Sequence, residues 1–116
     1  MMFLFLCWNC FFIMFPLILV GPLFVVISLL TLLFPPKKIN SFYGYRTSRS
    51  MKNQENWDLA QRFSSQLMLK QGLIMLVLAL ILAVLPIPIE VATLISLLLL
   101  LTSVINLFVQ TERRLK

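Results

Sequence analysis

Histidine is absent from this 116-residue sequence, cysteine occurs twice, and only four residues are acidic. The missing histidine removes the commonest general base and the commonest protein ligand for zinc. The carboxylates are scattered along the chain, at Glu55, Asp58, Glu90 and Glu112. Without a nucleophile–base pair or a cluster of ligands, the sequence predicts a protein that is not an enzyme, with no catalytic residue, metal or cofactor.

Apolar surface is what the chain has in excess. Hydrophobic residues make up 60% of the sequence, and its mean hydropathy is +0.97. A soluble domain of this size has too much surface for its volume to hide so many apolar side chains. A lipid bilayer removes the difficulty, because it is itself an apolar solvent. We therefore expect a single integral membrane domain over residues 1–116, of the all-α class.

The apolar residues fall into three segments, and a helix needs roughly 20 residues to cross about 30 Å of hydrocarbon. Prolines at Pro35-Pro36 and at Pro86 and Pro88 separate the segments. We predict three transmembrane helices in this order: a first span at about 13–34, a loop at 35–66, a second span at about 67–85, a third span at about 91–110, and a tail at 111–116.

The basic residues indicate the orientation of these spans. Seven of the ten lie within 37–70 and the other three within the tail, so all ten lie on one side of a three-span protein. Lysine and arginine in short flanking loops favour the cytoplasmic side. We expect the N-terminus outside and the C-terminus in the cytoplasm. This rule also explains the net charge of +6, so we expect no nucleic-acid partner.

The uncharged N-terminal segment contains Cys7 and Cys10, two cysteines with C-x-x-C spacing. We interpret them as part of an apolar helix, with Trp8 at the membrane interface, because zinc would need further ligands. A disulfide or redox-sensitive pair is the alternative, since the outer face can be oxidising. A cleaved signal peptide is a second alternative, but neither its basic n-region nor its small-residue cleavage site is visible.

The polar loop between the first two spans is the most informative segment. Asn53 suits a helix N-cap, and Glu55 would meet the positive end of the helix dipole. Apolar side chains then recur at helical spacing. We predict an amphipathic interfacial helix over 54–65, within the cytoplasmic loop, which lies against the membrane surface or the bundle and turns into the second span.

Three other loop residues have distinctive chemistry. Gly44 permits a turn with positive φ. Arg46 presents a planar fork of donors, so it either contacts lipid phosphates, clamps the loop or binds a partner. Trp57 is either an interfacial anchor or a ligand contact.

This loop resembles the SdpI family of bacterial multipass membrane proteins. The family pattern is an apolar span, then Pro-x-Asn-x-x-x-Gly-x-Arg-Thr, a Ser or Thr, and a Trp at the start of the next helix. The matching segments here are 35–47, Ser50 and Trp57-Asp58-Leu59-Ala60-Gln61, although Pro36 lies four residues before Asn40. The resemblance covers roughly 17–85, and it implies that the family's partner-binding function lies with Asn40, Gly44, Arg46, Thr47, Ser50 and Trp57.

The resemblance also implies a place and a role. It implies a multipass protein of the bacterial cytoplasmic membrane that binds or signals in immunity to a secreted antimicrobial peptide toxin, by sequestering the toxin or a cytoplasmic regulator. The expected partners are the lipid bilayer, a peptide toxin, a cytoplasmic regulatory protein and further copies of the chain in a homo-oligomer. A small transporter or transporter subunit is the alternative, although the spans lack charge for coupling.

Overall fold

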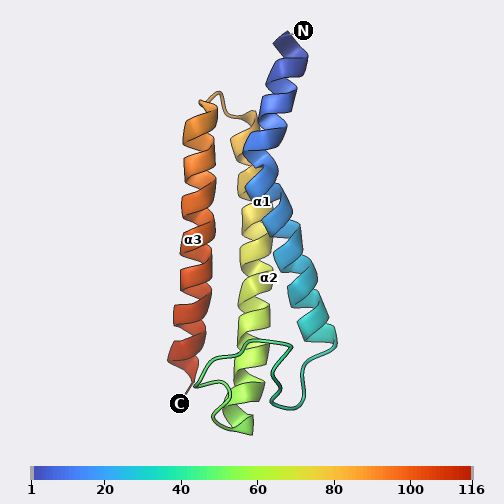
Figure 1. Cartoon of the computed structure of the whole chain (residues 1–116), viewed down its shortest axis with the longest axis vertical. Helices are drawn as coiled ribbons and strands as arrows, with labels where there is room; N and C mark the ends of the chain where they lie inside the picture. The colour runs from blue at the N-terminus through green and yellow to red at the C-terminus, as the bar shows by residue number, and fades with distance from the viewer. Residues whose placement is uncertain (1, 116) are drawn as a thin grey trace.

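The computed structural model describes the backbone of residues 2–115 and the side chains of Leu17 and residues 19–115. Its elements are the helices α1 (Met2–Leu33), α2 (Gln54–Val84) and α3 (Ile89–Arg114), with no strand among the described residues. The three helices lie side by side in a rod of 58 × 24 × 20 Å (Figure 1). The predicted all-α class is confirmed. The side chains of Cys7, Trp8 and Cys10 lie outside the described residues, so the interpretations placed on them stay predictions.

The two ends of the rod differ in composition. The loop 34–53 lies at the same end as the C-terminus, and the turn between α2 and α3 lies at the other end, as does the N-terminus (Figure 1). The basic residues of the loop therefore lie at the same end of the rod as Arg113 and Arg114, in the last turn of α3. The connection at 85–88 is short, and α2 and α3 form an antiparallel hairpin.

The predicted interfacial helix is not a separate element. Helix α2 runs without a break from Gln54 to Val84, so 54–65 forms its first three turns. Its start is as predicted, because the side chain of Asn53 accepts a hydrogen bond from the backbone N–H of Asn56 at 2.8 Å. No proline or glycine lies between 54 and 71 to end a helix. The buried face of these turns packs against the loop. Its apolar side chains therefore do not need the membrane surface, and the chain does not bend between 54–65 and the second span.

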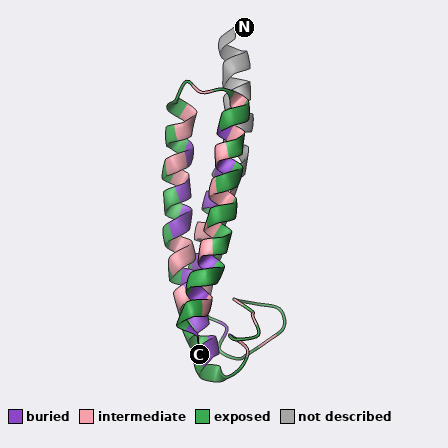
Figure 2. Ribbon diagram, turned by 90° about the vertical axis from the view of Figure 1, so that its left-hand side faces the viewer, coloured by how far each residue is buried: buried purple, intermediate pink, exposed green. Residues whose placement is uncertain are grey.

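Helices α2 and α3 are long and apolar enough to cross a bilayer. In their most apolar 18-residue windows only 22% and 11% of residues, respectively, are buried inside the protein. A core helix of a soluble protein would be mostly buried, whereas exposed positions run along the length of these helices (Figure 2). The described apolar stretch of α1, Leu19–Leu33, is shorter. Lipid is the solvent that suits such outward faces.

Helix α1 packs most extensively against α2, where two glycines oppose each other. A Cβ atom on Gly72 would lie 2.9 Å from Cγ2 of Val25 and 3.0 Å from the carbonyl oxygen of Gly21. Small residues allow helix backbones to approach this closely in membranes. Nearer the loop, the Ser65 hydroxyl donates to Oγ1 of Thr31 at 2.6 Å. These contacts fix the end of α1 from which the loop departs.

Candidate functional site

Asn40 shapes the first part of the loop. Its Oδ1 accepts hydrogen bonds from the backbone N–H groups of Phe42 at 3.0 Å and Tyr43 at 2.7 Å. Its Nδ2 donates to the carbonyl of Lys38 at 3.0 Å. A short amide side chain can mimic a backbone turn in this way. The Tyr43 hydroxyl donates to the carbonyl of Phe34 at 3.0 Å, which ties this turn to the end of α1.

Gly44 follows at a position that only glycine fits. Its φ is +99°, in the left-handed region, and a Cβ there would collide with Oε1 of Gln61 and lie 2.8 Å from Cγ of Pro36. The close approach lets the amide of Gln61 pair with the backbone of Tyr45. Gln61 accepts from the Tyr45 N–H at 2.7 Å and donates to the Tyr45 carbonyl at 2.7 Å. A side chain of α2 thus holds the centre of the loop.

Thr47 and Ser50 cap each other. The backbone N–H of Thr47 donates to Oγ of Ser50 at 2.7 Å, and the N–H of Ser50 donates to Oγ1 of Thr47 at 3.2 Å. Ser50 is fully buried. The pair satisfies two backbone donors that no helix or strand would satisfy, so it fixes a tight turn before α2.

Trp57 lies inside the contact between the loop and α2. Its side chain is fully buried, and its Nε1–H donates to the carbonyl of Pro36 at 2.6 Å. The structure therefore gives Trp57 neither of the roles that the sequence left open. Because it is enclosed by protein, it stabilises the loop instead of anchoring the chain in the membrane interface or contacting a ligand.

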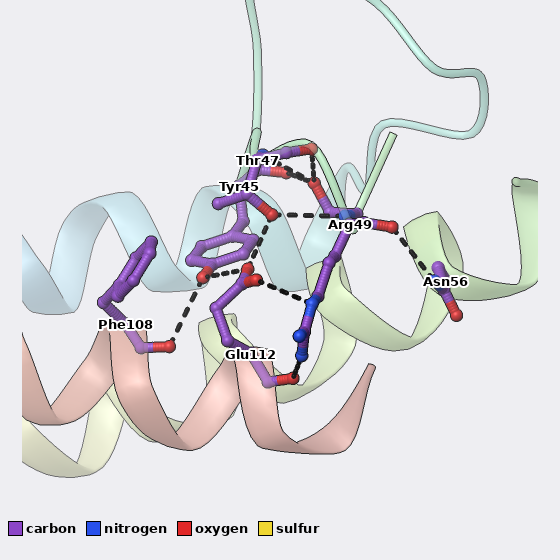
Figure 3. Close-up of polar contacts among 7 residues, drawn as sticks. Tyr45, Thr47, Arg49, Asn56, Phe108 and Glu112 are labelled. Atoms are coloured by element: carbon purple, nitrogen blue, oxygen red, sulfur yellow. Dashed lines mark hydrogen bonds and ion pairs between the residues drawn. The ribbon is translucent and has the colours of Figure 1, made fainter. Parts of the chain in front are cut away.

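Glu112 joins the end of α3 to the loop (Figure 3). Its Oε1 accepts hydrogen bonds from the Tyr45 hydroxyl at 2.9 Å and the Thr47 hydroxyl at 2.6 Å. Its Oε2 lies 4.0 Å from Nε of Arg49. The Glu112 side chain is 17% exposed and that of Arg49 61%, so water weakens this ion pair. The two hydroxyl donors to a charged acceptor therefore contribute most of the attachment.

Glu112 lies in the tail that the sequence predicted to be in water, and it is instead largely covered by the loop. Burial raises the pKa of the Tyr45 phenol, and the hydrogen bond to the Glu112 carboxylate raises it further. A second negative charge beside that carboxylate would be unfavourable. The phenol therefore remains a hydrogen-bond donor at neutral pH.

Arg46 is the exception among the six predicted site residues. It is exposed, and its guanidinium forms no hydrogen bond or ion pair with any described residue, so it does not clamp the loop. It lines a cavity of about 340 Å³ between the loop, α1 and α2, together with Thr31, Ser64 and Ser65. Asn40, Gly44, Thr47, Ser50 and Trp57 build the loop, and Arg46 is the motif side chain that this loop presents to the outside.

Two residues that build the site were not predicted as site residues. Gln61 lies within the segment that resembles the family, and its position one helical turn after Trp57 was the available signal. Glu112 is 65 residues from Thr47, and no local pattern links the two. Within the part of the chain that the structure describes, no three His, Cys, Asp or Glu side chains lie close enough to hold a metal ion.

Comparison with known proteins identifies the same family as the motif in the loop does. Residues 37–110, which include most of the loop, α2 and most of α3, match the SdpI/YfhL protein family. The chain is 41% identical over 96 residues to YfhL, an uncharacterized protein of Bacillus subtilis (strain 168), and this match covers 83% of the chain and 82% of YfhL. No solved structure gives a significant match. The chain therefore belongs to the SdpI/YfhL protein family.

Proposed function

We propose that this chain is a three-span protein of the bacterial cytoplasmic membrane that binds and signals without catalysis. The exposed apolar faces of α2 and α3 support two of the spans. Helix α1 has 32 residues, or about 48 Å at 1.5 Å per residue, which exceeds the hydrocarbon thickness. The loop and the end of α3 share one end of the rod and carry most of its basic residues, which favours the cytoplasm for that end.

Arg46 is the binding group in this proposal. The observation that carries it is the contrast between five motif residues that hold the loop and one motif residue that has no partner among the described residues. A guanidinium fork binds a carboxylate or phosphate with two parallel hydrogen bonds. We propose that its partner is an acidic side chain of a cytoplasmic regulatory protein, seated at the cavity beside Arg46.

Family membership supports a role in immunity to a secreted antimicrobial peptide toxin. A toxin that binds the apolar helices from outside would shift α3 relative to α1 and α2. Glu112 would transmit that shift, because it is hydrogen-bonded to Tyr45 and Thr47, the residues on either side of Arg46. Toxin binding and sequestration of the regulator would then be coupled through the end of α3.

Growth under toxin challenge tests this function. Cells that express Arg46→Ala should lose protection, and Arg46→Lys should restore little of it, because lysine keeps the charge but lacks the fork. Lys52→Ala is the matched control, since Lys52 is an exposed cation of the same loop. If removing the whole gene leaves toxin sensitivity unchanged, the immunity role is wrong.

Capture of the regulator tests the partner. Phe42 is 96% exposed and lines the same cavity as Arg46, so a photoreactive amino acid at position 42 should crosslink the partner in cells. The crosslink should disappear in Arg46→Ala and persist in Lys52→Ala. A small transporter remains the alternative function, and substrate flux into proteoliposomes that contain the purified chain would support it instead.

A further inference from the structure

A second site lies between α2 and α3, away from the loop. A cavity of about 250 Å³ separates the two helices, and most of its lining is apolar. Four polar side chains also line it: Gln71, Thr102, Ser103 and Asn106. Gln71 is only 8% exposed, and neither its Oε1 nor the Ser103 hydroxyl has a hydrogen-bond partner among the described residues. Among the described residues, the cavity therefore contains an unpaired amide acceptor and an unpaired hydroxyl.

Both groups lie inside the proposed spans at 67–85 and 91–110, in the half nearer the cytoplasm. Gln71 is 13 residues before the end of α2, and Ser103 is 14 residues after the start of α3, which places both roughly 20 Å from the turn at 85–88. Arg114 lies 11 residues beyond Ser103, or about 16 Å toward the cytoplasm. Hydrocarbon supplies no donor, so leaving these atoms unpaired is unfavourable.

Asn106 carries the complementary group. Its Oδ1 accepts a hydrogen bond from Nε2 of Gln110 at 2.8 Å, while its Nδ2 donates to no described residue. The Thr102 hydroxyl is already used, since it donates to the carbonyl of Leu98 at 2.7 Å. Asn106 therefore places an unpaired donor on the surface of α3, at the edge of a cavity with unpaired acceptors.

The exposed face of α3 beside Asn106 is suited to another helix. Leu98, Thr102, Ile105 and Val109 are all exposed and follow one another at spacings of four, three and four residues. This spacing is that of a seam between two supercoiled helices. In lipid, such seams are held by close packing and by hydrogen bonds between polar side chains.

We propose that a second copy of this chain docks its α3 into the groove between α2 and α3, as a symmetric dimer. The inference rests on the three-span topology proposed above. All copies then insert in the same orientation, so residues of the two copies meet at equal depth. Asn106 lines the cavity that contains Gln71 and Ser103, so the partner's Asn106 arrives at the same depth and donates into it.

Disulfide crosslinking in membranes tests the dimer. In a chain with Cys7→Ser and Cys10→Ser, Thr102→Cys should form a crosslinked dimer on mild oxidation, because Thr102 lies on the proposed seam and Asn106 stays in place. Val104→Cys is the matched control, because Val104 is also exposed but lies two residues away, about 200° around α3 and about 3 Å along it. Equal crosslinking of the two variants, or none at position 102, would overturn the proposal. Crosslinking does not depend on Arg46. Failure of the dimer proposal can therefore be distinguished from failure of the immunity proposal.

A double-mutant cycle tests the hydrogen bond itself. Gln71→Leu and Asn106→Leu should each weaken dimerisation in lipid vesicles on the order of tenfold, measured by energy transfer between labelled copies. The double variant should be little weaker than either single one, because both substitutions remove the same contact. Circular dichroism confirms that each variant keeps its helices. If Asn106 instead pairs with Gln71 of its own chain, both single variants will dimerise as the wild type does, and the proposal is wrong.

Discussion

The Thr47 hydroxyl donates a hydrogen bond of 2.6 Å to the carboxylate of Glu112, across 65 residues of sequence (Figure 3). Thr47 immediately follows Arg46 in the loop, and Glu112 lies in the last turn of α3. This bond makes the position of the presented arginine depend on the position of the third helix. The proposed coupling between the membrane helices and a cytoplasmic partner requires a connection of this kind.

Glu112→Ala should release the loop from α3. The substitution removes the acceptor for two hydroxyl groups, and hydrogen bonds to a charged group contribute about 1.5–3 kcal/mol each. Trypsin should then cut faster at Arg46, Arg49 and Lys52, by roughly tenfold or more. Glu55→Ala, at an exposed acid of the same end of the molecule, is the control and should leave the cutting rate unchanged.

Gly44→Ala should destabilise the folded loop. The new Cβ meets Gln61 and Pro36, and the left-handed backbone adds a strain of about 1–2 kcal/mol. Thermal unfolding in detergent should show a lower midpoint. In a Gln61→Ala background the collision with Gln61 is gone while the backbone strain remains, so the further loss caused by Gly44→Ala should be smaller there. An equal loss in both backgrounds would mean that the Gly44–Gln61 contact does not matter.

Gly72→Val should separate α1 from α2. A Cβ at Gly72 already lies within 3.0 Å of Cβ of Phe24 and of the carbonyl oxygen of Gly21, so larger side chains force the helices apart. Overpacking of this kind typically costs about 1–3 kcal/mol. The neighbouring Leu73 is 51% exposed, and Leu73→Val should leave the unfolding midpoint nearly unchanged. Equal midpoints for the two variants would show that α1 does not pack here.

The attachment of the loop should weaken in alkali. The pKa of Tyr45 is raised above its ordinary value of 10.0, so above that pH the folded state keeps a proton that the unfolded state has lost. Stability therefore falls as pH rises through this range and is unaffected by Tyr45 at lower pH. Unfolding midpoints measured from neutral pH to above pH 10 should show this fall, and Tyr45→Phe should reduce it. An identical fall in Tyr45→Phe would assign it to other groups.

Local signals in the sequence were enough to predict much of this structure. The N-cap at Asn53 marks the start of α2, and prolines mark the ends of the apolar segments. Gly44 has the positive φ that was expected. The continuity of α2 was missed because an amphipathic pattern does not say whether its apolar face meets lipid or protein. The hydrogen bonds from the loop to Glu112 were not predicted, because they join segments that are far apart in the sequence.

Asn40, Gly44, Thr47, Ser50 and Trp57 hold the loop in place, whereas Arg46 is proposed to bind a partner protein. The most direct measurement compares thermal stability in detergent with protection against the peptide toxin for alanine variants of Arg46 and Thr47. Arg46→Ala should leave the unfolding midpoint unchanged and abolish protection, whereas Thr47→Ala should lower the midpoint. The account is contradicted if Arg46→Ala destabilises the protein as much as Thr47→Ala, or if it leaves protection intact.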